Sequence, residues 1–407
     1  MVNQLPQGWK EEELGKLADV SSGDSAPQSS SCFLNGSYPF CRTSDVGKIH
    51  RSSNFSEIED YINETAISKL HLFHRGTILF PKSGASTLLN HRVMLSIDSY
   101  VSSHLATIYA NSIDRYYLYY FLCTVDAKQL VPNLDYPSLK ISELKNIKVP
   151  YPTDKGEQDY IVKTLDAVAE IIRLRKETIQ LAKELIPTIF QEMFGDPERK
   201  ICLADVATIK GGKRLPYGGQ LQDETTVHPY IRVADMVNNT IKKDELKYIS
   251  DVIYNKIQNY TISSRDVYIS IAGTIGRVGL VPDNLEGANL TENAAKIVLN
   301  ENKINKVFLV YELLTDVLQS QIKSLTVQAG VPKLAISRIE SLKIYCPPLS
   351  EQEEFADKVE QINKYIAAQQ EELEQFETLF QSLLHEAFTG VLTWNYPRKE
   401  CHDKKDK

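Results

Sequence analysis

Two glycine-containing segments of the sequence carry residue types that suit contacts with nucleic acid. "KGGKRLP" (210–216) places three cations beside two glycines, and "AGTIGR" (272–277) places Thr274 between Gly273 and Gly276 after an apolar run. Cations and hydroxyl groups bind phosphates and base edges, and glycine lets the backbone approach a ligand. A surface hairpin loop is the alternative for the first segment, and a plain β-turn for the second.

Matching segments in both halves of the chain extend this set. "KSGAST" (82–87) occupies the place in the first half that "AGTIGR" has in the second. In the first half the candidate DNA contacts are Arg42, Ser44, Lys82, Ser83, Ser86, Thr87 and Arg92. In the second half they are Lys210, Lys213, Arg214, Arg232, Thr274, Arg277 and Lys333.

Other polar and aromatic residues favour structural roles. Arg42 and Arg232 are each followed three residues later by an aspartate, so a bridge within each domain (Arg42–Asp45, Arg232–Asp235) competes with a DNA contact and is favoured. The tyrosine-rich "RYYLYYFL" (115–122) invites base stacking. Its helical spacing and its apolar counterpart "VFLVYEL" (307–313) favour core packing instead.

Catalytic motifs are absent from the sequence. It holds no GxxxxGK[ST] phosphate loop, no Asn/Asp-Pro-Pro-Tyr/Phe methyltransferase motif and no His/Asp/Glu set with metal-ligand spacing. The six cysteines show no CxxC spacing, which favours reduced thiols in a cytoplasm. No apolar run approaches the roughly 18–20 residues that span a bilayer. We therefore expect a cytoplasmic, non-catalytic protein that binds no metal.

The net charge of −7 is unevenly placed along the chain. Residues 351–388 contain ten Asp/Glu and two Lys, which leaves the remainder near neutral. An acidic arm attached to a near-neutral remainder permits DNA contact elsewhere.

An internal repeat organises the 407 residues, with an offset of 186 to 195. "GEQDYIVKTLDAVAEIIRLR" (156–175) returns as "SEQEEFADKVEQINKYIAAQ" (350–369), and "PSLKISELKNIKVPYP" (137–152) as "PKLAISRIESLKIYCP" (332–347). "LADV" occurs twice as well. β-rich runs alternate with turn clusters and one amphipathic helix in each copy, which predicts a mixed α+β unit.

A 3.5-residue apolar period follows each copy and predicts two long coiled-coil helices. In the first helix the seam is Ile161, Leu165, Val168, Ile172, Arg175, Ile179, Ala182, Ile186, Ile189 and Met193. In the second it is Phe355, Val359, Ile362, Ile366, Gln369, Leu373, Phe376, Phe380, Leu383 and Ala387. Both seams are interrupted by a polar residue at the same step.

Antiparallel packing is the arrangement that buries both seams. It places Arg175 near Leu373, and Gln369 near Ile179, in two adjacent central layers. Arg175 then either snorkels out of the seam or fixes the register of the pair. Pro187 lies within the first helix and predicts a kink near 183–187, or an earlier helix end.

The expected order is a globular domain (1–153), a long helix (154–196), a second globular domain (197–349), a second long helix (350–394) and a disordered tail (395–407). The helical seam from 161 to 193 is about 50 Å long at roughly 1.5 Å per residue, or about 14–15 base pairs of DNA. Two globular domains held that far apart suit a DNA target made of two separated half-sites.

The two-fold repeat, the "EQ" that opens each helix, the "P-x-L-x-I-S" runs and "SIAGTIGRVG" (270–279) resemble the specificity subunits of type I restriction-modification systems. The resemblance covers roughly residues 5–394. The first half departs from the family pattern, because "NLDYPS" (133–138) lacks the glycine that "QAGVPK" (328–333) keeps.

The resemblance implies two target-recognition domains that read a bipartite site in double-stranded DNA across a fixed gap. It implies docking of two adenine methyltransferase subunits, and through them of a restriction subunit. S-adenosylmethionine, ATP and Mg would then bind the partners, and no cofactor would bind this chain. A coiled-coil scaffold or adaptor without base-specific DNA contact is the alternative.

Overall fold

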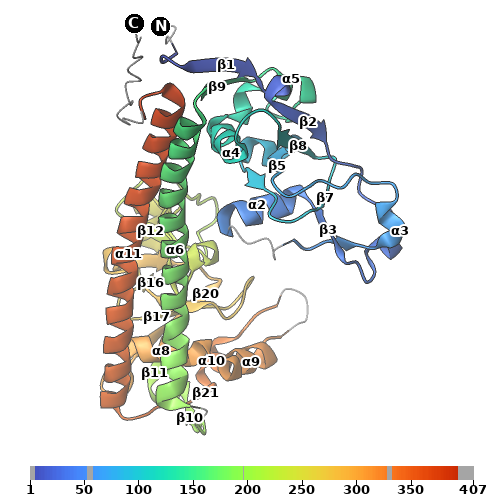
Figure 1. Ribbon diagram of the computed structural model, residues 1–407. Helices are drawn as coiled ribbons and strands as arrows, with labels where there is room; N and C mark the ends of the chain where they lie inside the picture. Colours follow the sequence, from blue (N-terminus) through green and yellow to red (C-terminus); the bar gives the residue numbers. More distant parts are fainter. Residues whose placement is uncertain (1–4, 53–57, 196, 328–331, 393–407) are drawn as a thin grey trace, which may run out of the picture. The chain divides into compact units, whose positions relative to one another are not determined.

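The computed structural model describes residues 5–52, 58–195, 197–327 and 332–392 (Figure 1). The chain divides into two compact units, one formed by Met1–Thr178 with Gln369–Lys407 and the other by Ile179–Ala368. We call them unit 1 and unit 2. The long helices α6 (Lys155–Phe194) and α11 (Leu349–Thr389) contribute one part to each unit. The tail 395–407, for which the sequence predicts disorder, lies outside the described residues.

Unit 1 contains a four-stranded antiparallel sheet in the order β2-β8-β5-β6 and a three-stranded sheet in the order β4-β3-β7, whose β3 and β7 run parallel. The strands β1 and β9 pair separately. The strands are β1 (Trp9–Glu13), β2 (Ala18–Ser22), β3 (Tyr38–Cys41), β4 (Tyr61–Ile62), β5 (Ile78–Pro81), β6 (Val93–Met94), β7 (Tyr100–Val101), β8 (Leu105–Ala110) and β9 (Lys148–Pro152). The helices are α1 (Leu14–Leu17), α2 (Thr43–Ser52), α3 (Glu64–Ile67), α4 (Arg115–Thr124) and α5 (Ile141–Lys145).

Unit 2 repeats this plan with the antiparallel sheet β11-β20-β17-β18 and the mixed sheet β15-β12-β19-β16, whose β12 and β19 run parallel. The strands are β10 (Ile201–Cys202), β11 (Ala207–Gly211), β12 (Pro229–Ile231), β13 (Met236–Val237), β14 (Thr240–Ile241), β15 (Lys247–Tyr248), β16 (Thr261–Ile262), β17 (Val267–Ser270), β18 (Val278–Leu280), β19 (Ala288–Leu290), β20 (Ala294–Leu299) and β21 (Lys343–Ile344). The helices are α7 (Asp251–Ile257), α8 (Lys306–Leu314), α9 (Asp316–Leu325) and α10 (Ile336–Glu340).

The helix that follows each sheet is capped and buried in the same way. The Asp114 side chain accepts hydrogen bonds from the backbone N–H groups of the second and third residues of α4, and Asn305 does so for α8. Such side-chain acceptors satisfy N–H groups that have no partner within the helix. Tyr117 is fully buried in α4 and its hydroxyl donates to the Pro150 carbonyl at 2.8 Å. Tyr117 and Tyr120 are therefore core residues, as the spacing predicts, whereas Tyr116 is exposed.

The packing inside each unit makes the long helices antiparallel. In unit 1 Ile161 near the start of α6 shares an apolar core with Leu384 near the end of α11. In unit 2 Phe190 near the end of α6 packs on Phe355 near the start of α11, with ring centroids 5.2 Å apart. α6 continues beyond Pro187 to Phe194, so the expectation of an earlier helix end was wrong. Proline is tolerated here because the helix is held by its tertiary contacts, with Ile186 and Phe190 buried on either side.

Candidate nucleic-acid interface

Three segments of unit 2 meet at one edge of its antiparallel sheet. β11 and β17 both end at this edge, because Gly211 pairs with Ala295 and Ser270 pairs with Ala294 at the start of β20. Residues 332–335, which precede α10, join them through an isolated bridge between Ala272 and Lys333. We call this edge, with the loops that begin at Gly212 and Ile271, residues 332–335 and the turn 291–293, the unit 2 loop edge.

The unit 2 loop edge gathers several predicted contacts that are far apart in sequence. The exposed members are Lys213, Arg214, Thr274 and Lys333, with exposed Lys210 one residue before the end of β11. The Arg214 Nε donates to Glu292 Oε1 at 2.7 Å, yet the Arg214 side chain is 79% exposed. The Lys213 ammonium lies 5.3 Å from the ring centroid of Tyr260. Exposed pairs contribute only about 0–1 kcal/mol, so these cations remain available to a phosphate.

The packing of unit 2 requires glycine at position 212, and the sequence alone did not reveal this requirement. A Cβ at this position would lie 2.1 Å from the carbonyl oxygen of Thr291 and 2.4 Å from that of Leu290. Gly23 is equally tight in unit 1, at 2.4 Å from the carbonyl oxygens of Val101 and Ser102. These glycines allow close approach of the chain to itself. Packing within unit 2 is therefore sufficient to require glycine at 212, whether or not a phosphate binds there.

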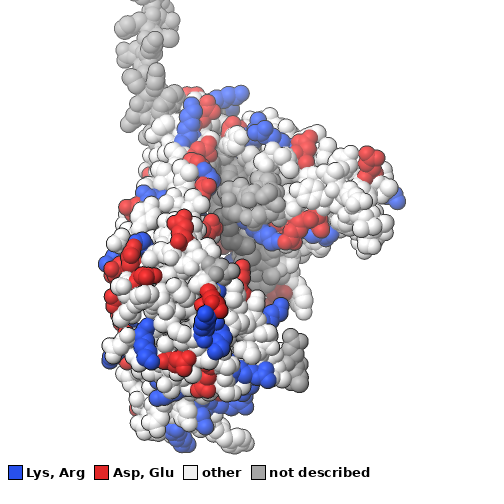
Figure 2. Space-filling view, turned by 90° about the horizontal axis from the view of Figure 1, so that it is seen from below, with Lys and Arg blue, Asp and Glu red and all other residues white. Residues whose placement is uncertain are grey.

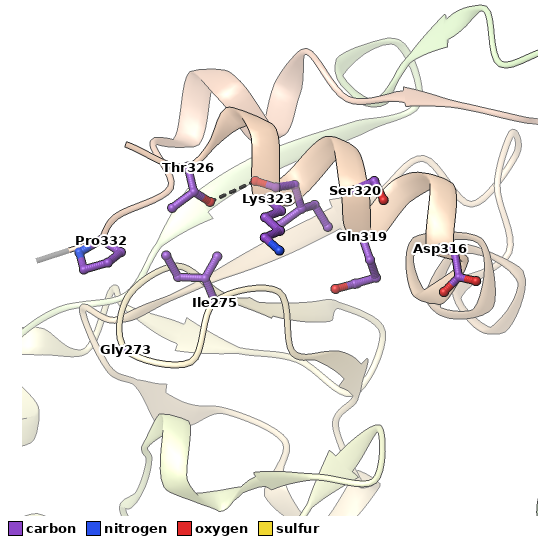
Figure 3. Close-up of a pocket in the computed structure, with 9 residues that line it drawn as sticks. Gly273, Ile275, Asp316, Gln319, Ser320, Lys323, Thr326 and Pro332 are labelled. Atoms are coloured by element: carbon purple, nitrogen blue, oxygen red, sulfur yellow. Dashed lines mark hydrogen bonds between the residues drawn. The ribbon is translucent and has the colours of Figure 1, made fainter. Parts of the chain in front are cut away.

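The segment "AGTIGR" forms the connection of the β17–β18 hairpin, in which Gly273 and Gly276 have φ values of 74° and 87°. Left-handed φ values of this kind favour glycine. Beside this loop lies a hollow of about 510 Å³, lined by Gly273, Ile275, Asp316, Gln319, Ser320, Ile322, Lys323, Thr326 and Pro332. Lys323 extends from α9 towards Ile275 (Figure 3). The connection runs from 271 to 277, which is longer than a four-residue β-turn, and Thr274 lies exposed within it.

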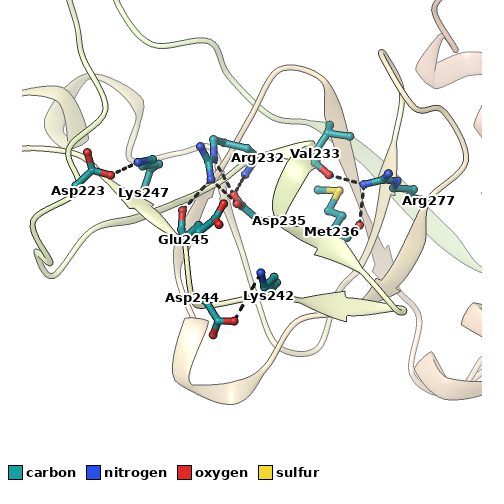
Figure 4. Close-up of polar contacts among 10 residues, drawn as sticks. All are labelled: Asp223, Arg232, Val233, Asp235, Met236, Lys242, Asp244, Glu245, Lys247 and Arg277. Carbon is teal, nitrogen blue, oxygen red and sulfur yellow. Dashed lines mark hydrogen bonds and ion pairs between the residues drawn. The ribbon is translucent and has the colours of Figure 1, made fainter. Parts of the chain in front are cut away.

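Two predicted DNA-contacting arginines of unit 2 bind the protein itself (Figure 4). The Arg232 guanidinium donates to both carboxylate oxygens of Asp235, at 3.1 and 2.6 Å, and to the Glu245 carbonyl at 2.8 Å. The Arg277 guanidinium donates to the carbonyls of Val233 and Met236, both at 3.1 Å. The Arg232–Asp235 bridge is therefore present, and Arg277 holds the 233–236 turn in place.

Unit 1 has a corresponding loop edge, formed by the ends of β2 and β5 and the start of β8. Ser22 pairs with Ala106, Pro81 pairs with Leu105, and an isolated bridge joins Ser83 to Ser138. We call this the unit 1 loop edge, with the loops that begin at Gly23, at 82 and at 137 and the turn 102–104. Of the predicted residues, Lys82, Ser83 and Ser86 are half-buried there, and the Ser86 hydroxyl donates to the Ser83 carbonyl at 3.2 Å.

Two predicted contacts of unit 1 are unavailable to a ligand, because Arg92 and Thr87 are both 0% exposed. The Arg92 guanidinium carbon lies 3.3 Å from the ring centroid of Phe80, and the guanidinium donates to the carbonyls of His91 and Val125. Burial lowers the pKa of Arg92 to about 10. We therefore withdraw Arg92 and Thr87 from the candidate DNA contacts.

Arg42 pairs differently from its counterpart in unit 2. Its guanidinium forms an ion pair with Asp60, and not with Asp45 as the sequence favoured. The Asp45 carboxylate accepts the Arg42 backbone N–H at 2.7 Å, as Asp235 does for the Arg232 N–H. Burial raises the pKa of Asp45. What the repeat preserves is this backbone cap, and Ser44 beside it is exposed.

The polar interruption of the two helix seams is a direct contact within unit 1. The Arg175 guanidinium donates to Gln369 Oε1 at 2.7 Å, pairs with Glu372 and lies 5.2 Å from the ring centroid of Phe376. The arginine side chain is 25% exposed. Arg175 and Gln369 therefore bond to each other, and do not form two separate layers as the step count predicted.

Acidic and basic side chains alternate over the face drawn in Figure 2, so bulk charge does not locate a DNA-binding surface there. Among the described residues, no group of three or more His, Cys, Asp or Glu is arranged to hold a metal ion. Within the same residues, no helix is long and apolar enough to cross a membrane.

Sequence reasoning missed residues that share the two loop edges. Glu292 and Asn293 lie beside the predicted cations of unit 2, and Asp24 lies at the unit 1 loop edge. The sequence carries only a weak signal for these residues, because each lies next to a short strand and belongs to no recognisable motif. Strand pairing across 80 or so residues is needed to place them.

An α+β unit is built twice, with hydroxyl and cationic side chains on the loops of one sheet edge and a shared antiparallel helix pair. This is a modular class of architecture whose loops carry the residue types that suit contacts with nucleic acid. Comparison with known proteins specifies this class. The model of the type I restriction modification DNA specificity domain matches residues 6–184 and again residues 198–378. The chain belongs to this family of type I restriction-modification specificity subunits, which carry DNA-recognition domains and are generally non-catalytic.

Relatives and solved structures extend the match over most of the chain. The chain is 21% identical over 428 residues to the type I restriction enzyme MjaIX specificity subunit of Methanocaldococcus jannaschii, covering 96% of this chain and 95% of that protein. It is 26% identical over 167 residues to the EcoBI specificity subunit of Escherichia coli, covering 40% and 35% of the two chains.

Among solved structures, the type I restriction-modification S subunit from M. genitalium aligns with a TM-score of 0.53 and 16% identity, covering 95% of this chain and 98% of that chain. A chain from a structure of type I restriction-modification complex assembly aligns with a TM-score of 0.56 and 19% identity, covering 96% and 100%. The predicted α+β fold with its internal repeat and two long helices is thereby confirmed.

Proposed function

We propose that this chain reads a bipartite site in double-stranded DNA, with one half-site bound by each unit and a gap set by the length of α6 and α11. The recurrence of the same loop edge in both units carries this proposal. Each edge presents hydroxyl, amide and cationic groups, which are the groups that bind phosphates and base edges. The family membership supports DNA as the ligand.

The chain further docks two adenine methyltransferase subunits, and through them a restriction subunit. It binds no cofactor, so S-adenosylmethionine, ATP and Mg act in the partners, and the complex works in the cytoplasm. A half-site of three or four bases at roughly 1–3 kcal/mol each gives about 3–12 kcal/mol of discrimination. Affinity comes mainly from phosphate contacts, and the net charge of −7 opposes binding to a polyanion. The chain alone therefore binds DNA weakly, and the docked methyltransferase subunits supply the further contacts that tight binding needs.

A gel-shift titration with and without the methyltransferase subunits tests the docking. Weak, salt-sensitive binding by the chain alone that tightens when the subunits are added supports the proposal. Nanomolar binding by the chain alone that resists salt contradicts it. Equal affinity for all duplexes in the full complex favours the scaffold alternative without base-specific contact.

Helix length offers the sharper test of the gap. Seven residues added to each helix at matched positions preserve the 3.5-residue seam and lengthen the pair by about 10 Å, or about three base pairs. Mapping methylated adenines genome-wide in a host that carries the variant should show the same two sequence blocks with a longer gap. The same insertion in one helix only is the control, because it mismatches the two seams. An unchanged gap in the doubly lengthened chain would refute the role of the helices.

A further inference from the structure

The two loop edges share one backbone plan, so their positions match one to one. The N–H groups of Gly23 and Gly212 donate at 3.0 Å to the carbonyls of the first residues of β8 and β20 respectively. The N–H groups of the next residues, Asp24 and Lys213, donate at 2.8 Å to the last residues of β7 and β19. Asp24 therefore matches Lys213, and the residues after them, Ser25 and Arg214, match as well.

A second pair of contacts fixes the other side of each edge. Ser83 forms an isolated bridge with Ser138, and Ala272 forms one with Lys333. The next N–H, on Leu139 or Leu334, donates to the carbonyl of the residue just past β5 or β17 at 2.8 and 2.9 Å. Ser138 therefore matches Lys333.

The charge at these matched positions differs between the units. Unit 2 carries Lys213, Arg214 and Lys333, all exposed, where unit 1 carries Asp24, Ser25 and Ser138. The Asp24 carboxylate of unit 1 accepts hydrogen bonds from His71, through its backbone N–H at 2.6 Å and its Nδ1 at 3.1 Å.

Each unit also has charges without a match in the other. Unit 1 has Lys82 and Lys140 at its edge, where unit 2 has Ile271 and Ala335. Unit 2 has Glu292, which pairs with Arg214. The balance still favours unit 2, because it has three exposed cations at the matched positions. Unit 1 has one exposed cation, Lys140, while Lys82 is half-buried and Asp24 repels an anion.

Binding to the DNA backbone depends on such cations, because each neutralised phosphate releases condensed counterions. We propose that the unit 2 loop edge makes most of the phosphate contacts of this chain, and that the unit 1 loop edge reads its half-site mainly through uncharged donors and acceptors. The inference rests on the proposed function, and assigns the salt-dependent part of DNA binding to Lys213, Arg214 and Lys333.

Binding of the full-length chain to two unrelated duplexes of about 30 base pairs tests the assignment, because phosphate contacts do not require the specific site. Fluorescence anisotropy is recorded between about 50 and 200 mM salt, and the slope of log K against log salt is compared. The loss variant is Lys213→Ser/Arg214→Ser/Lys333→Ser, and its matched control is Lys82→Ser/Lys140→Ser. The gain variant, Ser25→Arg/Ser138→Lys, gives exposed positions of unit 1 the side chains of unit 2.

The loss variant should reduce the magnitude of the salt slope by about 2 to 3, and the control variant should reduce it by less than about 1. The gain variant should increase it by about 1 to 2. Two outcomes overturn the assignment while leaving DNA binding intact. The first is a control variant that reduces the salt slope as much as the loss variant does. The second is a loss variant whose salt slope and thermal transition are both unchanged. A wild-type chain without salt-dependent binding to either duplex overturns the assignment and counts against the proposed DNA-binding function itself. The gain variant keeps the test valid where the loss variant fails to fold.

Discussion

Gln158 and Gln352, the second residues of the two "EQ" pairs, make the same hydrogen bonds in the two units. Each Oε1 accepts the backbone N–H of the residue that caps the helix after the sheet, from Asp114 at 3.2 Å and from Asn305 at 2.8 Å. Each Nε2 donates to the proline carbonyl that precedes the long helix, at 2.8 and 2.7 Å. Both side chains are buried. The repeated motif is therefore a structural joint between each sheet domain and its long helix.

Gln352→Leu should destabilise unit 2, because the N–H of Asn305 and the proline carbonyl lose their buried partner. An unsatisfied buried polar group costs about 1–3 kcal/mol, so we expect a loss of about 2–4 kcal/mol in the free energy of unfolding. Urea denaturation followed by circular dichroism measures it. Gln361→Leu is the matched control on the exposed side of the same helix, and should change stability by less than about 0.5 kcal/mol. Equal effects of the two substitutions would count against the joint.

Arg175→Leu/Gln369→Leu should raise stability by about 1 kcal/mol, because the seam becomes continuous and a half-buried charge is removed. The double variant should also admit slipped helix pairings, since the polar contacts of Arg175 with Gln369 and Glu372, which fix the register, are lost. Size-exclusion chromatography and cross-linking of cysteine pairs placed across α6 and α11 report on register. Arg173→Leu is the control, because Arg173 pairs with Glu170 and Glu177 of its own helix. A double variant that remains homogeneous in register would disprove this role.

Arg277→Ala should lower the free energy of unfolding by about 1–3 kcal/mol, because the Val233 and Met236 carbonyls lose a charged donor. Its salt slope for DNA binding should stay unchanged. Lys333→Ala, at an exposed position of the loop edge, should show the opposite pattern, with a lower slope and unchanged stability. Differential scanning calorimetry and anisotropy titrations on the same samples separate the two. A reduced slope in Arg277→Ala would return this arginine to the DNA contacts.

Arg214→Ala should raise the pKa of the Glu292 carboxyl. Burial raises this pKa, but the hydrogen bonds from Arg214 and Thr291 and the charge of Arg214 outweigh burial and leave it below its usual value. A carboxylate with a lowered pKa contributes stability above its unfolded pKa, and the contribution disappears as pH falls through the folded pKa. The variant therefore loses stability mainly above the acid range. Carbon-detected NMR titration of Glu292 measures the shift.

The Glu286 carboxyl is the internal control for that titration, because its lowered pKa depends first on the Ser264 backbone N–H and not on Arg214. Bound DNA that draws Arg214 away from Glu292 should raise the Glu292 pKa in the same direction. A Glu292 pKa that is the same in the variant and the parent would show that the ion pair is not formed in solution.

The elements and their repetition were predictable because their information lies along the chain. A 3.5-residue period that recurs 194 residues later, with Arg175 and Gln369 at the same step, predicts two helices that pack on each other. The apolar spacing around Tyr117 likewise predicted a core helix. Patterns of this kind reflect local geometry, in which neighbours three, four or seven residues apart share a face.

The candidate site depended on tertiary structure, because its residues come together only through pairing of distant strands. Lys213, Thr274 and Lys333 meet because β11, β20 and β17 align in one register, which no local period specifies. Side-chain type also does not reveal burial. Arg92 was predicted to contact DNA because of its residue type, yet its guanidinium packs on the Phe80 ring and has no exposed surface. Lys213 and Lys333 of the unit 2 loop edge are exposed instead. Sequence thus determined what is repeated, and the fold decided which of the repeated residues are exposed at the loop edges.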